Sequence, residues 1–132
     1  MEELVRSLYA ALADWDKERL RELLDPSFEA ELPEGMPVGA GGRRTGAEAM
    51  IRDTWRPIGR TYAMRPEPTE WIACDGGRLL VLGRYRGHAR ATGLPVDAAF
   101  AHLWTARDGR LVGLRHVTDT ALWAAALEGA PA

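Results

Sequence analysis

The first half of the chain places apolar side chains at helical spacing. Apolar residues recur every three to four positions over residues 2–13 and predict an amphipathic helix. Asp16 can cap a second helix, which should stop at Asp25-Pro26. A third helix should follow Thr45 and end at Pro57 and Gly59. One face of that third helix carries Ala47, Met50, Ile51, Thr54 and Ile58.

The segment between the second and third helices has a different pattern. Residues 28–32 alternate between apolar and polar side chains, which is typical of a short strand. Residues 33–42 are rich in glycine and proline and predict a loop. This loop could act as a lid over a site.

From Tyr62 onward the apolar period changes to two, and turn sequences separate the alternating runs. We expect four antiparallel strands over residues 62–74, 78–90, 96–106 and 110–118, and a last short helix from Asp119 to Leu127. Helices followed by a strand meander are typical of an α+β domain whose helices cover one face of a twisted sheet. No repeat or linker divides the chain, so residues 1–132 should form a single domain.

Composition excludes several classes of function. The 132 residues contain no apolar run close to the roughly 20 that a membrane span needs. The net charge of −2, with basic and acidic residues interleaved, gives no surface suited to nucleic acid. The N-terminus lacks the basic start of a signal peptide, and Cys74 is the only cysteine. We therefore expect a cytoplasmic protein without an intramolecular disulfide.

Five local segments are informative together with the order of the elements: residues 5–12, 83–87, 100–105, 107–111 and 118–120. They resemble the SnoaL-like polyketide cyclase group of the nuclear transport factor 2-like superfamily. The resemblance implies a cone in which three N-terminal helices pack on a strongly curved, mainly antiparallel sheet, followed by a short C-terminal helix. Relatives include cyclases, isomerases, dehydratases and binding modules, so the fold alone does not decide the function.

Two catalytic patterns of the superfamily are missing at the matching positions. Leu8 and Leu32 stand where ketosteroid isomerases have a tyrosine and an aspartate, so we expect neither the isomerase base nor its oxyanion tyrosine. The Arg84-Tyr85-Arg86 stretch does not supply the Arg-x-Asp pair of limonene-type epoxide hydrolases. We therefore do not expect these two reactions in their known form.

His102 and His116 are the main catalytic candidates. If residues 107–109 form a three-residue turn, His102 lies opposite Leu114 and both histidines share a sheet face; a two-residue turn would put them on opposite faces. In related cyclases a histidine and an aspartate at similar separation do the acid-base work, and these histidines should occupy those positions. Either imidazole could instead be a structural group bonded to a carbonyl.

Other side chains should complete an enclosed apolar site. Asp53, at the edge of the third helix, would have a raised pKa and could act as a base if it faced the cone, although a solvated surface charge is the alternative. Tyr85 can donate its hydroxyl to a ligand. The further residues expected to contact substrate are Trp104, Phe100, Leu114, Trp55, Met50 and Leu8.

These observations leave two hypotheses about function. The first is an enzyme that needs no cofactor or metal and moves protons on a hydrophobic oxygenated molecule, as a cyclase, isomerase or dehydratase does. The second is a module of the same fold that binds a ligand or pairs subunits without catalysis. In either case we expect a homodimer, because a sheet with helices on one face leaves the other face uncovered.

Overall fold

The computed structural model describes residues 1–128. Two helices, α1 (Glu2–Asp14) and α2 (Lys17–Leu23), open the chain as predicted. Asp16 caps α2 by accepting a hydrogen bond from the backbone N–H of Arg19 at 3.1 Å. The left-handed backbone of Trp15 (φ 50°) ends α1 and turns the chain between the two helices.

The third helical segment is longer than the sequence predicted. It runs through α3 (Ala47–Met50), a π-helical turn η1 (Ile51–Trp55) and α4 (Arg56–Thr61). Pro57 therefore does not end the helix, contrary to expectation. Proline cannot donate to the carbonyl four residues before it, and Arg44 Nη2 donates to that Asp53 carbonyl instead, at 3.3 Å. The wider π turn just before the proline accommodates its ring.

Six strands form one sheet in the order β2-β1-β6-β5-β4-β3. The four strands of the meander lie within one residue of their predicted bounds: β3 (Tyr62–Cys74), β4 (Arg78–Ala89), β5 (Pro95–Arg107) and β6 (Arg110–Thr118). β1 (Leu24–Leu32) is longer than predicted and pairs in parallel with β6. β2 (Gly42–Thr45), an edge strand paired with β1, was not predicted.

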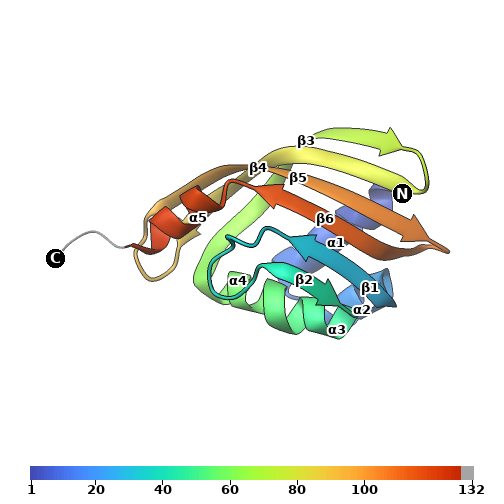
Figure 1. Ribbon diagram of the computed structural model, residues 1–132, viewed down its shortest axis with the longest axis horizontal. Helices are drawn as coiled ribbons and strands as arrows, with labels where there is room; N and C mark the ends of the chain where they lie inside the picture. The colour runs from blue at the N-terminus through green and yellow to red at the C-terminus, as the bar shows by residue number, and fades with distance from the viewer. Residues whose placement is uncertain (129–132) are drawn as a thin grey trace.

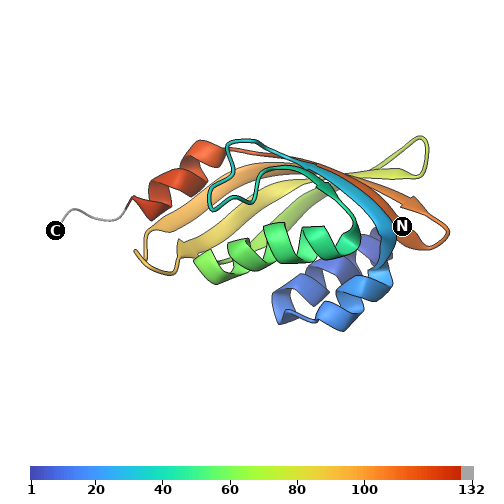
Figure 2. The same cartoon turned by 60° about the horizontal axis from the view of Figure 1, so that its bottom comes forward.

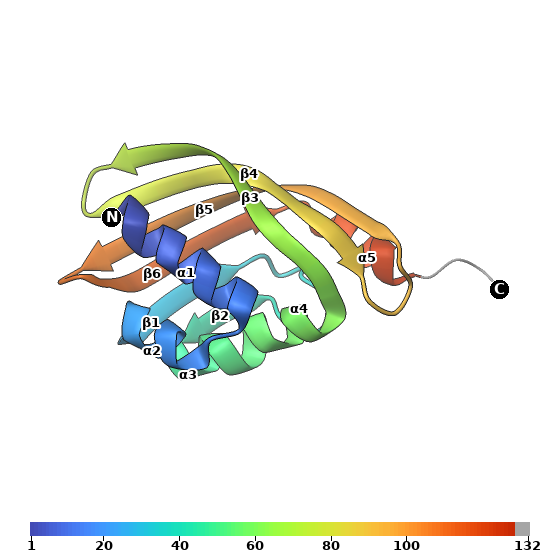
Figure 3. The ribbon, with the colours of Figure 1, turned by 180° about the vertical axis from the view of Figure 1, so that it is seen from behind.

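The sheet curves around the helices (Figures 1 and 2). Seen from behind, α1 and the α3–α4 segment lie across the concave face of the sheet (Figure 3). The last helix, α5 (Thr120–Leu127), lies at one end of the sheet (Figure 1). Strand alternation sends one set of side chains of β4, β5 and β6 into the concave side and the other set to an outer face without helices.

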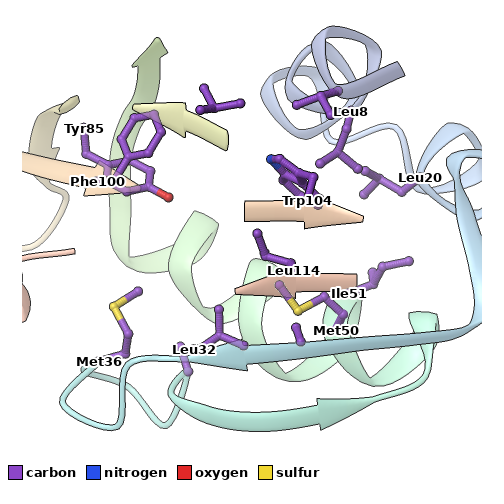
Figure 4. Close-up of a cluster of buried hydrophobic side chains, with 14 of the residues drawn as sticks. Leu8, Leu20, Leu32, Met36, Met50, Ile51, Tyr85, Phe100, Trp104 and Leu114 are labelled. Carbon is purple, nitrogen blue, oxygen red and sulfur yellow. The ribbon is translucent and has the colours of Figure 1, made fainter. Parts of the chain in front are cut away.

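Apolar side chains from both layers meet on the concave side. Figure 4 shows Leu8 and Leu20 of the first helices close to Trp104 of the sheet. The 33–41 segment contributes Met36 and Ala40, both buried, and Thr54 donates to the Ala40 carbonyl at 3.1 Å. This segment packs into the core and forms no wall of the pocket described below, so the lid interpretation is wrong.

Candidate functional site

The β5–β6 hairpin brings the two histidines face to face. Asp108 and Gly109 both have positive φ values (54° and 78°), which makes a two-residue turn of the type that Asp-Gly favours. The three-residue turn expected from the sequence is therefore wrong. Val112 forms a bulge that shifts the register between Thr105 and Ala106, and this shift pairs His102 directly with His116. The predicted shared face is thus confirmed, but a bulge rather than the turn produces it.

A chain of hydrogen bonds joins these histidines to two tyrosines. The Tyr85 hydroxyl lies 2.7 Å from His102 Nε2 and 3.0 Å from His116 Nε2. On the other side of His102, the Tyr9 hydroxyl lies 2.7 Å from Nδ1. Trp104 Nε1 donates to the same Tyr9 oxygen at 3.2 Å. Helix α1 and strands β4, β5 and β6 thus each contribute to one continuous polar cluster.

This cluster lines a pocket of about 330 Å³, a size that suits a small molecule. Helix α1, the α3–α4 segment, strands β3–β6 and helix α5 all contribute to its walls. The aromatic residues on the walls are Tyr9, Trp15, Trp55, Tyr85, Trp104 and Trp123. Flat apolar walls around a few polar atoms are typical of sites for aromatic or polycyclic ligands.

Burial makes the titratable groups of the site neutral. Desolvation, and secondarily the repulsion that a protonated His116 would exert, hold the pKa of His102 well below 6.5. Desolvation lowers the pKa of His116 to about 4. Burial raises the pKa of the Tyr9 and Tyr85 hydroxyls. At pH 7 the cluster therefore carries no net charge but holds several mobile protons.

The structure separates the other sequence-predicted site residues into pocket walls and core. Trp104, Leu114, Trp55 and Tyr85 lie on the wall of the pocket, and their contact with substrate stays a prediction. Phe100 lies behind it, where its ring stacks on His102 with a centroid separation of 4.2 Å. Leu8 and Met50 are fully buried (0% exposed) and lie outside the pocket lining, so their predicted contact with substrate is wrong.

Asp53 is a surface residue. Its carboxylate makes two hydrogen bonds with the Arg52 guanidinium, at 2.8 and 2.9 Å. That contact lowers the pKa of Asp53, whereas a base inside the cone would need a raised pKa. Asp53 also does not line the pocket. The interpretation of Asp53 as a base is therefore wrong, and the solvated alternative is correct.

Sequence reasoning missed Tyr9. Its position beside Leu8 placed it in the apolar, buried stripe of the first helix. In the structure Leu8 points into the core while Tyr9, one residue further, borders the pocket. Tyr9 is thus a pocket tyrosine that the sequence analysis did not name.

Within residues 1–128, no group of three or more His, Cys, Asp or Glu side chains is arranged to hold a metal ion. Across the same residues, none of the helices combines the length and apolarity that crossing a membrane requires.

Residues 5–114 match the SnoaL-like domain family. The chain belongs to the SnoaL-like family. Solved structures place this SnoaL-like protein among nuclear transport factor 2-like folds. One, a protein of unknown function from Burkholderia pseudomallei K96243, is 31% identical, with 95% of each chain covered and a TM-score of 0.83. Another, from Burkholderia thailandensis E264, is 26% identical over 95% of each chain, with a TM-score of 0.81.

A third solved structure, of TerC co-crystallised with polyporic acid, is 29% identical, covers 96% of this chain and 97% of that chain, and has a TM-score of 0.82. No curated protein matches the sequence. These comparisons confirm the predicted superfamily and its α+β fold with helices on a curved sheet.

Proposed function

We propose that this SnoaL-like protein is a cofactor-independent enzyme that moves protons on a hydrophobic oxygenated small molecule, in reactions of the cyclase, isomerase or dehydratase type. The observation that carries the proposal is the pair of opposed histidines, bridged by Tyr85 inside an aromatic pocket. Neutral imidazoles can accept a proton, and their N–H groups can donate one, so both halves of general acid-base catalysis are present.

The two histidines have different roles in this proposal. Both ring nitrogens of His102 lie within hydrogen-bond distance of tyrosine hydroxyls. His116 uses only Nε2, and within residues 1–128 its Nδ1 has no hydrogen-bond partner. His116 is therefore the catalytic residue that touches the substrate, and His102 positions the cluster behind it.

The pocket walls favour a flat, oxygenated ligand. Tryptophan and tyrosine rings offer stacking surfaces, and the polar atoms gather on the sheet side of the pocket. TerC, which is similar over nearly its whole length, was co-crystallised with polyporic acid, and this supports a ligand of comparable flatness. Binding without catalysis is the competing function, and the experiment below separates the two.

A proton-exchange assay tests the proposal. The probe is 2-tetralone, a bicyclic ketone whose α-carbon hydrogens exchange with D₂O once a base removes them. We expect the protein to accelerate this exchange, and His116→Gln to slow the accelerated rate by roughly 10²–10⁴ while the ketone still binds. His88→Gln, at an exposed position of β4, is the matched control and should keep the full rate. Ketone binding without faster exchange would favour the binding module.

We further propose that the outer sheet face forms a homodimer. Val117 and Ile72 are 65% and 41% exposed on that face, and leucines from β4 and β5 lie between them. Pairing two copies would bury these side chains. Light scattering should give twice the 14.5 kDa chain mass, and Val117→Glu should shift the measured mass toward that of the monomer; a wild-type monomer at micromolar concentration would contradict the proposal.

The cytoplasmic location remains a prediction, to be checked by cell fractionation.

A further inference from the structure

The hydrogen-bond cluster has a fixed proton count, which determines how its members pair. A neutral imidazole carries one proton on one of its two nitrogens, and a tyrosine hydroxyl donates one hydrogen bond. The buried Tyr85 hydroxyl contacts the Nε2 atoms of both histidines. Its oxygen could accept from both Nε2 atoms, but the buried Tyr85 proton would then have no acceptor among the described residues, which is costly. Tyr85 therefore donates to one Nε2, and the other Nε2 donates to Tyr85. The two histidines must therefore be opposite tautomers.

Two proton arrangements satisfy every bond in the cluster and also give the buried Tyr85 proton an acceptor. In the first, Tyr9 donates to His102 Nδ1, His102 Nε2–H donates to Tyr85, and Tyr85 donates to His116 Nε2. His116 then presents its Nδ1–H to the pocket. In the second, every bond is reversed: His116 presents a bare Nδ1, and Tyr9 presents its O–H. Trp104 donates to the Tyr9 oxygen in both arrangements, because an indole can only donate.

We propose that Tyr9, His102, Tyr85 and His116 form a proton relay whose two ends, the Tyr9 oxygen and His116 Nδ1, both act on a hydrophobic carbonyl compound. This inference rests on the proposed function and narrows its substrate class. A proton leaves a substrate carbon for one end of the relay. Each internal proton moves one bond along, and the other end delivers a proton to the carbonyl oxygen.

The step balances without any oxidant, cofactor or net change in charge. For an enolisation, the C–H bond breaks, its electron pair forms the C=C bond, and the oxygen gains an O–H bond. For an aldol-type cyclisation, the same electron pair forms a C–C bond to a second carbonyl, whose oxygen takes the proton. No member of the relay ends the cycle charged, which suits a site where burial disfavours every ionised form.

The tautomers can be read directly from ¹⁵N chemical shifts of histidine-labelled protein. We expect one Nδ1–H and one Nε2–H imidazole at pH 7 in the wild type. His88 in the same spectrum serves as the exposed reference. Two buried histidines in the same tautomeric form would overturn the relay, whatever the outcome of the 2-tetralone assay.

Kinetics test whether protons pass through the whole relay. Tyr9→Phe and Tyr85→Phe should each slow 2-tetralone exchange by roughly 10²-fold or more, and combining Tyr9→Phe with His116→Gln should add little, since the groups act as a unit. A Tyr9→Phe variant that folds and keeps the wild-type rate would overturn the relay while leaving His116 as the base. No exchange by the wild type would instead contradict the proposed function itself.

A different observation concerns the mouth of the pocket. A wider hollow of about 1050 Å³ adjoins it and shares Leu12, Trp15 and Met64 with its lining. The charged residues that line the hollow are Lys17, Arg56, Arg60, Arg65, Arg86, Arg90 and one acid, Glu67. The chain as a whole has a net charge of −2, so this concentration of cations is local.

Most of these cations are available to a ligand. Arg86 lies 3.6 Å from Glu67 and also contacts Asp97. Among the described residues, no ion pair involves Arg56, Arg60 or Arg65. We infer that the hollow binds an anionic group, a carboxylate or a phosphate, attached to the apolar body that enters the pocket. The cations would attract such a ligand and set its orientation.

Matched probes test this anion site. 4-(2-Naphthyl)butanoate and the phosphate ester of 4-(2-naphthyl)butanol should each bind more tightly than the neutral alcohol at low salt, and the advantage should shrink in 0.5 M NaCl. The stronger of the two anions identifies carboxylate or phosphate as the preferred group. Arg56→Gln and Arg60→Gln should each weaken anion binding two- to fivefold, whereas Arg19→Gln, whose side chain pairs with Glu22, should not. Equal affinities for alcohol and anions would overturn the inference.

Discussion

The neutral state of His116 makes a quantitative prediction about stability and pH. Burial lowers the pKa of His116 from 6.5 to about 4. Between these two pH values the imidazole is therefore protonated in the unfolded chain and neutral in the folded protein. The corresponding contribution to stability is fully present above about pH 6.5 and is lost as the pH falls toward 4. The shift corresponds to about 3 kcal/mol. That loss is a large part of the roughly 5–15 kcal/mol that stabilises a typical domain.

Urea denaturation at a series of pH values between 7 and 4 measures this effect. We expect the free energy of unfolding to fall more steeply with decreasing pH in the wild type than in His116→Gln, because glutamine does not titrate. The exposed His88→Gln variant should follow the wild type. Below about pH 4 the carboxylates of Asp25 and Asp97, whose pKa values are lowered by Ser27 and Arg84, add their own losses in every variant. Parallel curves for wild type and His116→Gln would refute the buried neutral imidazole.

Three further changes test separate parts of the structure. Cys74→Ala should change neither the melting temperature nor the exchange rate, because among the described residues its thiol makes one hydrogen bond, to the Ile72 carbonyl at 3.5 Å; loss of exchange with normal melting would give the thiol a role. Tyr62→Phe should lower the free energy of unfolding by about 1–2 kcal/mol, because it removes the hydroxyl that donates to the buried Trp123 carbonyl at 2.7 Å. An unchanged denaturation midpoint would exclude that contribution. Deletion of Val112 should retain 2-tetralone exchange, because it removes only the extra residue of the bulge and leaves His116 paired with His102 in a regular ladder; loss of exchange in protein with native-like circular dichroism would contradict that register.

Most of the fold could be predicted from local periodicity. Turn sequences separate the four strands of the meander, and their bounds were predicted within one residue. β2 was not predicted because its two central residues are arginines that lie exposed or half-buried and give no apolar alternation. Its backbone is extended because it pairs with β1. The helix past Pro57 escaped because the donor that replaces the proline, Arg44, comes from another element. Contacts between distant segments decided both cases.

The site was harder to predict than the fold. The sequence placed His102 and His116 on one face, but only the structure reveals the Val112 bulge that produces this arrangement. A single bulge reverses every facing residue beyond it, and no periodic signal marks it in the sequence. Tyr9 was missed because a phenol and a leucine look alike in an apolar stripe, and only packing decides which of them reaches the pocket.

The most direct test of the account is the rate of 2-tetralone exchange measured at saturating ketone in wild type and in His116→Gln, together with the dissociation constant of the ketone for each. We predict a rate reduced by roughly 10²–10⁴ in the variant, with a dissociation constant within a fewfold of the wild type. An accelerated exchange rate that His116→Gln leaves unchanged would contradict the assignment of His116 as the group that moves the proton.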